Sequence, residues 1–165
     1  MEIIDELRNK KGFIAALDQS GGSSKRTLAN YGIGEELITS DEVMFDYIHK
    51  MRSRVITNEA FNDRILGVIL FENTMERDID GINTVKYLEN KGIPSFLKID
   101  VGLEDEDGGM QMLKEIPNLE KRLEKAKSYG IVGTKMRSVI KEYNEYGIKK
   151  VIEQQFSLAK IIIAH

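Results

Sequence analysis

Short apolar runs alternate along this chain with longer segments in which apolar residues recur every three to four positions. The first pattern predicts β-strands, and the second predicts helices that pack one face against a sheet. The predicted strands are Phe13–Leu17, Ile65–Phe71, a run after Pro94, and Ile131–Lys135. The predicted helices are Glu2–Asn9, Lys25–Tyr31, a long one from Ser40, Asn83–Asn90, one from about Asn118, and a last one that carries Val151 to Ile163. This alternation is typical of βαβ units around a parallel sheet.

Each predicted strand leads into charged residues. In the run Phe96-Leu97-Lys98-Ile99-Asp100, Lys98 and Asp100 are two positions apart and therefore lie on one face of the strand. Parallel strands end at one edge of a sheet, so their charged side chains share a rim, which is where (β/α) enzymes keep their chemistry. The charged residues at the predicted strand ends are Asp18, Glu72, Lys98, Asp100, Lys135 and Arg137.

Two serines stand at predicted helix starts. Ser24 is a candidate N-cap after the glycine pair at 21–22, and Ser40-Asp41-Glu42 begins the long helix. That helix has an apolar stripe at a period near 3.6, which we expect to pack on the sheet. The stripe comprises Val43, Met44, Tyr47, Ile48, Met51 and Val55.

The pattern gives an α/β fold of the (β/α) TIM-barrel type, truncated to about four strand–helix units. A closed barrel takes eight units and roughly 250 residues, so the prediction is a half barrel that forms a single domain over residues 1–165. The last helical pattern stops inside its apolar stripe, which suggests an incomplete protein. Open edges on the first and fourth strands would then favour pairing with a second copy or with a missing half. A complete small α/β domain is the alternative.

Composition narrows the classes of function. The 165 residues are 41% hydrophobic, enough for a real core, and carry a net charge of −3 with a pI near 5.5. No basic face is therefore expected for nucleic acid or an acidic membrane. With no cysteine, disulfides and zinc–thiolate sites are excluded, and two distant histidines do not predict a metal site. The start lacks a secretory signal and no stretch approaches a membrane span, so a cytoplasmic location is predicted.

Four segments carry a resemblance to a known family. They are Lys11–Ser23, Gly67–Thr74, Phe96–Asp100 and Gly133–Arg137, which resemble, in order and spacing, motifs of the bacterial branch of class I fructose-bisphosphate aldolase. The resemblance extends over essentially the whole chain. It implies a TIM barrel that reversibly cleaves fructose 1,6-bisphosphate into dihydroxyacetone phosphate and glyceraldehyde 3-phosphate in glycolysis and gluconeogenesis. The chemistry runs through a lysine Schiff base and needs no cofactor or metal.

The resemblance also implies roles for individual residues. Asp18 matches an acid that moves the hydroxyl proton beside the scissile carbon–carbon bond, and Lys135 matches a lysine that assists Schiff-base formation. Ser20, Ser23 and Lys98 match groups that hold the phosphate distal to the ketone. Arg137 shares the strand face of Lys135 and adds a cation for the doubly phosphorylated substrate.

Other readings stay open at several positions. Asp100 beside Lys98 is interpreted as a supporting ion pair that orients the lysine. Glu72 either supports the ligand or caps the following loop, and the glycine pair at 21–22 either approaches the phosphate or only makes a turn. The acidic run 104–109 is interpreted as a solvated loop after the third strand.

The family's Schiff-base lysine belongs to strands beyond residue 165, so the isolated chain is predicted to be inactive. Two hypotheses follow. In the first, this is the N-terminal part of an aldolase, which becomes catalytic when the other half is supplied. In the second, it is a non-catalytic half barrel that binds sugar phosphates or anions and pairs with itself. The expected partner is a phosphorylated sugar in both.

Overall fold

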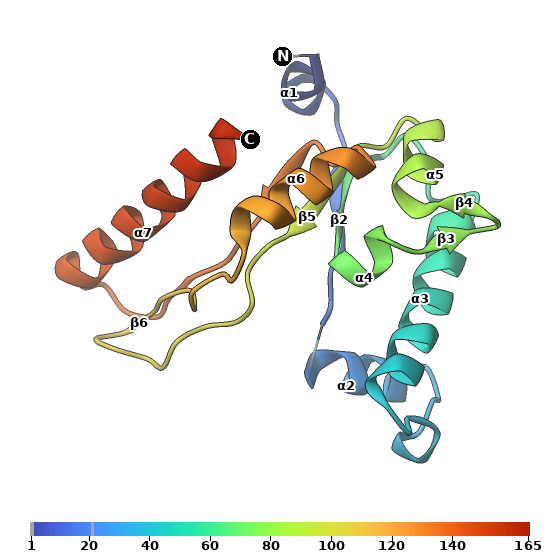
Figure 1. Ribbon diagram of the computed structural model, residues 1–165, viewed down its shortest axis with the longest axis horizontal. Coiled ribbons are helices and arrows are strands. Elements are labelled where there is room, and N and C mark those ends of the chain that lie inside the picture. The colour runs from blue at the N-terminus through green and yellow to red at the C-terminus, as the bar shows by residue number, and fades with distance from the viewer. Residues whose placement is uncertain (1, 21) are drawn as a thin grey trace. The chain divides into compact units, whose positions relative to one another are not determined.

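The computed structural model describes residues 2–20 and 22–165, without the side chains of residues 2–4, 6, 22 and 23 (Figure 1). The chain forms two compact units, which are described separately. The first unit contains Met1–Leu97 and Tyr129–Gly133, and the second contains Lys98–Ser128 and Thr134–His165.

The first unit holds most of a four-stranded sheet with strand order β1-β2-β5-β7. Strand β1 pairs in parallel with β2, and β2 pairs in parallel with β5, as the alternation predicted. The main strands are β1 Phe13–Leu17, β2 Ile65–Leu70, β5 Ser95–Lys98 and β7 Gly133–Lys135. The other elements of this part of the chain are α1 Glu2–Asn9, α2 Gly22–Asn30, the 3-10 helix η1 Glu35–Leu37, α3 Asp41–Thr57, α4 Glu72–Met75, β3 Asp78–Ile79, β4 Ile82–Asn83 and α5 Thr84–Asn90.

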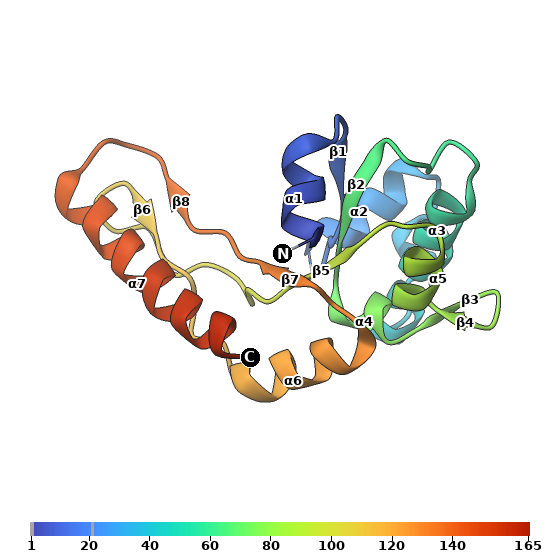
Figure 2. The same cartoon turned by 90° about the horizontal axis from the view of Figure 1, so that it is seen from above.

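One face of this sheet is covered and the other is open. Val68 pairs with Ser95 and Leu70 with Leu97, and all four side chains are buried. Helices α3 and α5 lie on one side of the strands (Figures 1 and 2). Because side chains alternate along a strand, the neighbouring positions face the other way. There Ile14 is 47% exposed.

Phe96 on that second face is held between two glycines. A Cβ on Gly67 would lie 2.7 Å from the Phe96 ring, and one on Gly133 would lie 2.9 Å from it. The ring of Phe96 therefore occupies the space that side chains would fill on the strands to either side of β5. Packing this close tolerates no added carbon without a shift.

Helix α3 begins where the sequence predicts, but its buried face differs from the predicted stripe. Ser40 is its N-cap and accepts a hydrogen bond from the Val43 N–H at 3.2 Å. The buried residues of α3 are Met44, Ile48, Arg52 and Ile56. Of the predicted apolar stripe, only Met44 and Ile48 are among them. Met44 and Ile48 pack on Leu28 of α2. The helix thus places a charged residue, Arg52, in the middle of its buried face.

Some of the other local predictions are confirmed and one is wrong. Helix α1, strand β1 and the strand ends near residues 70 and 98 are confirmed. Ser24 as an N-cap is wrong, because α2 begins at Gly22 and Ser24 lies buried inside it. Gly21, one of the predicted glycine pair, lies outside the described residues. Asn83 is the N-cap of α5, and its side chain accepts from the Val85 N–H at 3.0 Å.

The second unit is built on a small antiparallel pair and two helices. Its elements are β6 Met110–Gln111, α6 Leu119–Tyr129, β8 Val139–Ile140 and α7 Glu145–Ala164. Strand β6 pairs with β8, and the Gln154 side chain of α7 bonds both the N–H and the C=O of Leu113 at 2.9 Å. Residues 104–107 are exposed, as predicted for a solvated loop.

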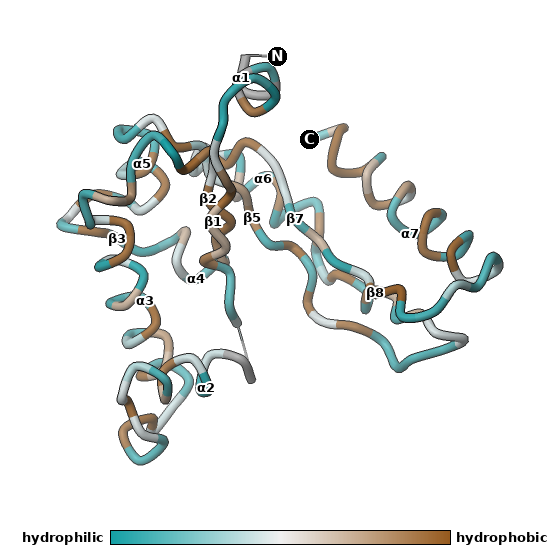
Figure 3. Tube along the Cα trace, turned by 180° about the vertical axis from the view of Figure 1, so that it is seen from behind, coloured by the Kyte–Doolittle hydropathy of each residue, from teal (hydrophilic) through white to brown (hydrophobic). Residues whose placement is uncertain are grey.

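Hydrophobic and hydrophilic residues follow one another along helix α7, as the brown and teal segments of Figure 3 show. Val151 is buried, whereas Ile152 and Phe156 are more than half exposed. Among the helices in the described part of the chain, none is long and apolar enough to cross a membrane.

Candidate active site

The strands of the first unit end at one edge of the sheet. Leu17 of β1 pairs with Leu70 of β2, and Leu70 pairs with Leu97 of β5. Because these pairs are parallel and in register, the chain leaves the three strands at matching positions. Asp18 follows the first strand and Lys98 is the last residue of the third.

In the first unit, Asp18 is nearly buried and shares its surroundings with Arg52. The Arg52 side chain is fully buried. Its Nη1 donates to Thr74 Oγ1 at 2.6 Å, and its Nη2 donates to the Gln19 carbonyl at 2.5 Å. This arginine therefore ties helix α3 to the loop after β1 and to helix α4.

Burial lowers the pKa of Arg52 to about 10, and the negative charge of Asp18 opposes that shift. Desolvation penalises the charged form of a buried cation, and a nearby carboxylate restores part of the loss. The guanidinium remains protonated at neutral pH, so Asp18 faces a fixed positive charge. The apolar pattern of the sequence does not point to Arg52, because that pattern contains no charged residue. Its signal was the four-residue spacing from Ile48 and to Ile56.

The other predicted residues of the first unit occupy the same edge. Ser20 is half-buried in the loop after β1. Glu72 is half-buried and is the first residue of α4, in its first turn. Ser23 falls in helix α2, but its side chain lies outside the described residues.

In the second unit, Asp100 lies between two lysines. Lys98 Nζ is 3.6 Å from Asp100 Oδ1, and Lys135 Nζ is 4.0 Å from Asp100 Oδ2. The Asp100 side chain is 8% exposed, against 16% for Lys98 and 30% for Lys135. The predicted pairing of Lys98 with Asp100 is confirmed, and the structure adds Lys135 to it.

The backbone at Ile99 fixes this cluster. The Ile99 N–H donates to the Lys135 carbonyl at 3.0 Å, and Arg122 of α6 donates through Nη1 to the Ile99 carbonyl at 2.9 Å. Both peptide groups that flank Ile99 are thus held, and with them the directions of Lys98 and Asp100. The sequence does not single out Arg122 either, because it is one of several charged residues on helix α6.

Arg137 does not join the cluster. Its side chain is exposed, and in the described part of the chain it has no hydrogen bond or ion pair. Lys98 and Lys135 place two ammonium groups beside Asp100 in a partly enclosed place. That arrangement suits an anion such as a phosphate, with both amines held close to it. No group of three or more potential metal-ligating residues occurs among the described His, Asp and Glu.

Comparison with known families adds the decisive observation. The model of class-I fructose-bisphosphate aldolase, the glycolytic aldolase family, matches residues 3–161. The chain belongs to this family. The resemblance in the four strand-end segments is thereby confirmed at the level of the family.

A solved aldolase has the same fold. It is fructose-bisphosphate aldolase from Plasmodium falciparum, crystallised in a ternary complex with TRAP and a small-molecule inhibitor. The TM-score is 0.75 at 21% sequence identity, and the match covers 98% of this chain and 49% of that one. The chain therefore spans about half the length of this aldolase. Its sheet has the α/β fold of an aldolase, with no closed barrel in the described residues.

Proposed function

We propose that this chain supplies the N-terminal half of a class I fructose-bisphosphate aldolase of the bacterial branch. The reaction is the reversible cleavage of fructose 1,6-bisphosphate to dihydroxyacetone phosphate and glyceraldehyde 3-phosphate. It runs through a Schiff base on a lysine and takes place in the cytoplasm. Family membership and coverage of 49% of a solved aldolase support this reading.

The cluster around Asp100 is the observation that carries the proposal. Lys98 binds the phosphate distal to the ketone, and Lys135 assists formation of the Schiff base. Asp100 keeps both amines near the substrate, since its two oxygens each lie within 4.0 Å of an ammonium nitrogen. A fixed pair of cations costs little reorganisation when the anion arrives.

Asp18 accepts the proton from the hydroxyl on the carbon that becomes the aldehyde. A carboxylate placed against that hydroxyl is suited to general-base work. Arg52 lies near Asp18 and holds the loop that carries it. Ser20 and Ser23 bind phosphate, as the family resemblance implies. Arg137 adds a cation and Glu72 supports the loop after β2.

The proposal includes an inactive isolated chain. The nucleophilic lysine of the family belongs to the half that this chain does not match, and imine chemistry requires that amine. Residues 1–165 then form half of a (β/α) barrel. Its open edges pair either with the other half or with a second copy.

Two measurements test the proposal. The first is calorimetric titration of the chain with fructose 1,6-bisphosphate. Lys98→Met and Lys135→Met should each weaken binding about tenfold, which corresponds to the loss of one charged contact to phosphate. Lys149→Met, an exposed lysine on α7, is the matched control and should bind as the parent does.

The second measurement is borohydride reduction in the presence of dihydroxyacetone phosphate, read by mass spectrometry. No covalent adduct is expected on this chain alone. An adduct on Lys98 or Lys135 would show that the chain has its own nucleophile and would overturn the inactive-half reading. If Lys98→Met and Lys135→Met bound fructose 1,6-bisphosphate as tightly as the parent chain, the Asp100 cluster would not be part of the binding site.

A further inference from the structure

The first unit contains a pocket whose lining residues do not include Asp18, Gln19 or Arg52. It has a volume of 680 Å³ and lies between the end of α2, one side of α3 and the turn after α3. Pockets of roughly 300–1,000 Å³ are the size that holds small ligands. Leu28 forms part of its wall and is fully buried, and Met51 and Val55 of α3 add apolar surface.

The backbone holds both ends of this pocket in place. After α2, Gly32 adopts a positive φ of 81°, and the Ile33 N–H returns to the Leu28 carbonyl at 3.0 Å. After α3, the Phe61 N–H donates to the Asn58 carbonyl at 3.0 Å. The pocket walls are therefore anchored turns and not free loops.

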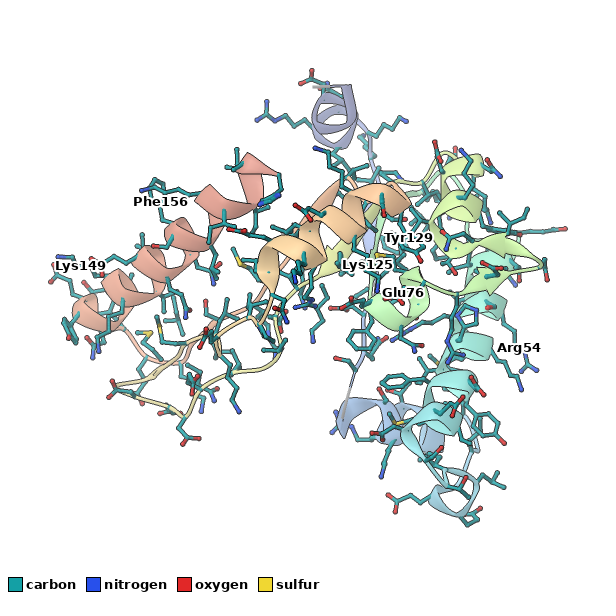
Figure 4. The ribbon with its side chains drawn as sticks, in the orientation of Figure 1. Arg54, Glu76, Lys125, Tyr129, Lys149 and Phe156 are labelled. Carbon is teal, nitrogen blue, oxygen red and sulfur yellow. The ribbon has the colours of Figure 1, made fainter. Side chains whose placement is uncertain are left out.

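Two cations stand at the pocket, and no carboxylate lines it. Lys50 and Arg54 are four residues apart on α3 and are exposed. Figure 4 shows Arg54 projecting from α3 on the side away from the strands. Within the described residues neither makes an ion pair, although Lys50 lies 5.7 Å from the centre of the Tyr47 ring. In a chain with a net charge of −3, two unmatched cations beside an apolar hollow favour an anionic occupant.

We propose that this pocket binds a small amphipathic carboxylate. The apolar body lies against Met51, Val55 and Tyr31, and the carboxylate reaches Lys50 and Arg54. Positions four apart on a helix are neighbours, so one anion can contact both. The site is independent of the aldolase chemistry, because none of the strand-end residues lines it.

The test compares octanoate with octanamide, which has the same chain length and no charge. Ligand-observed NMR titration of the whole chain should show octanoate binding roughly tenfold tighter, as two exposed ion pairs allow. The double variant Lys50→Met/Arg54→Met should remove that preference. The variant Lys149→Met makes a charge change at an exposed lysine outside the pocket and should keep it.

A second variant tests the apolar part. Ala60 lines the pocket and its side chain is exposed. Ala60→Trp should therefore fill the pocket without disturbing the packing of the core. Ala60→Ser is its control. Filling should abolish binding of both probes, while fructose 1,6-bisphosphate should displace neither. Equal binding of octanoate and octanamide to the parent chain, or octanoate binding that survives Ala60→Trp, would overturn the proposal.

Discussion

Arg52 on helix α3 of the first unit and Asp100 after strand β5 of the second unit are both buried charged residues, but different groups surround them. Arg52 is fully buried, and its guanidinium bonds a hydroxyl and a carbonyl near Asp18. Asp100 meets two lysines at 3.6 and 4.0 Å, both partly open to solvent. The first arrangement uses a charge to join pieces of the fold. The second places two ammonium groups that are partly open to solvent beside a buried carboxylate, where a ligand can reach them.

The largest expected effect comes from Arg52→Met. The change removes the guanidinium hydrogen bonds to the Gln19 carbonyl and Thr74 Oγ1, and it removes a positive charge near Asp18. Breaking such a buried arrangement should lower the free energy of unfolding by about 3 kcal/mol. Urea unfolding measures this, with Arg26→Met on the exposed side of α2 as control. A loss below about 1 kcal/mol would show that Arg52 holds nothing together.

Asp100→Asn should have a smaller effect on stability and a larger one on ligand binding. The lysines are partly solvated, so losing the shared carboxylate should cost about 1–2 kcal/mol of unfolding free energy. Both amines would lose the carboxylate that they share, and the affinity for fructose 1,6-bisphosphate, measured by titration, should fall. If Asp100→Asn destabilised the chain as much as Arg52→Met, the two regions would not differ as described.

Arg122→Met should affect the Asp100 cluster through the backbone of Ile99. It removes the hydrogen bond to the Ile99 carbonyl, worth about 1 kcal/mol. Affinity for fructose 1,6-bisphosphate should fall about threefold, because Lys98 and Asp100 lose part of their orientation. Arg122→Lys retains a donor and should recover part of the affinity, which a purely structural role elsewhere in α6 would not explain.

The smallest expected effect concerns pH. The folded-state pKa of Arg52 is lowered to about 10, below its unfolded value, so folding favours the neutral side chain. Below that pKa the group is protonated in both states, and the cost of burying it is constant. The difference in unfolding free energy between the parent chain and Arg52→Met should therefore be flat from about pH 6 to pH 9. The cost should fade only as pH rises above about 10.

The sequence predicts the strands well because their signals are local. The run Phe13–Leu17 lies between Gly12 and Asp18, and the structure has the same bounds. The pairing of Lys98 with Asp100 also follows from a spacing of two on a strand. Both features need only neighbouring residues and the period of the element.

What the sequence did not predict depends on contacts between distant segments. The short pair β6–β8 joins residues about 30 apart and has no long apolar run. The bond from Arg122 to Ile99 crosses 23 residues, and that from Arg52 to Gln19 crosses 33. The residue type of Ser24 suits an N-cap, but α2 begins earlier, at Gly22.

The ring of Phe96 between Gly67 and Gly133 makes three positions interdependent. A methyl group at either glycine would collide with the ring, so Gly67→Ala or Gly133→Ala alone should be poorly tolerated. Trimming the ring first, as in Phe96→Leu, would free the volume that such a methyl needs. The volume available to the side chains at positions 67, 96 and 133 is therefore limited. Natural relatives with a larger residue at 67 or 133 should have a smaller residue at 96.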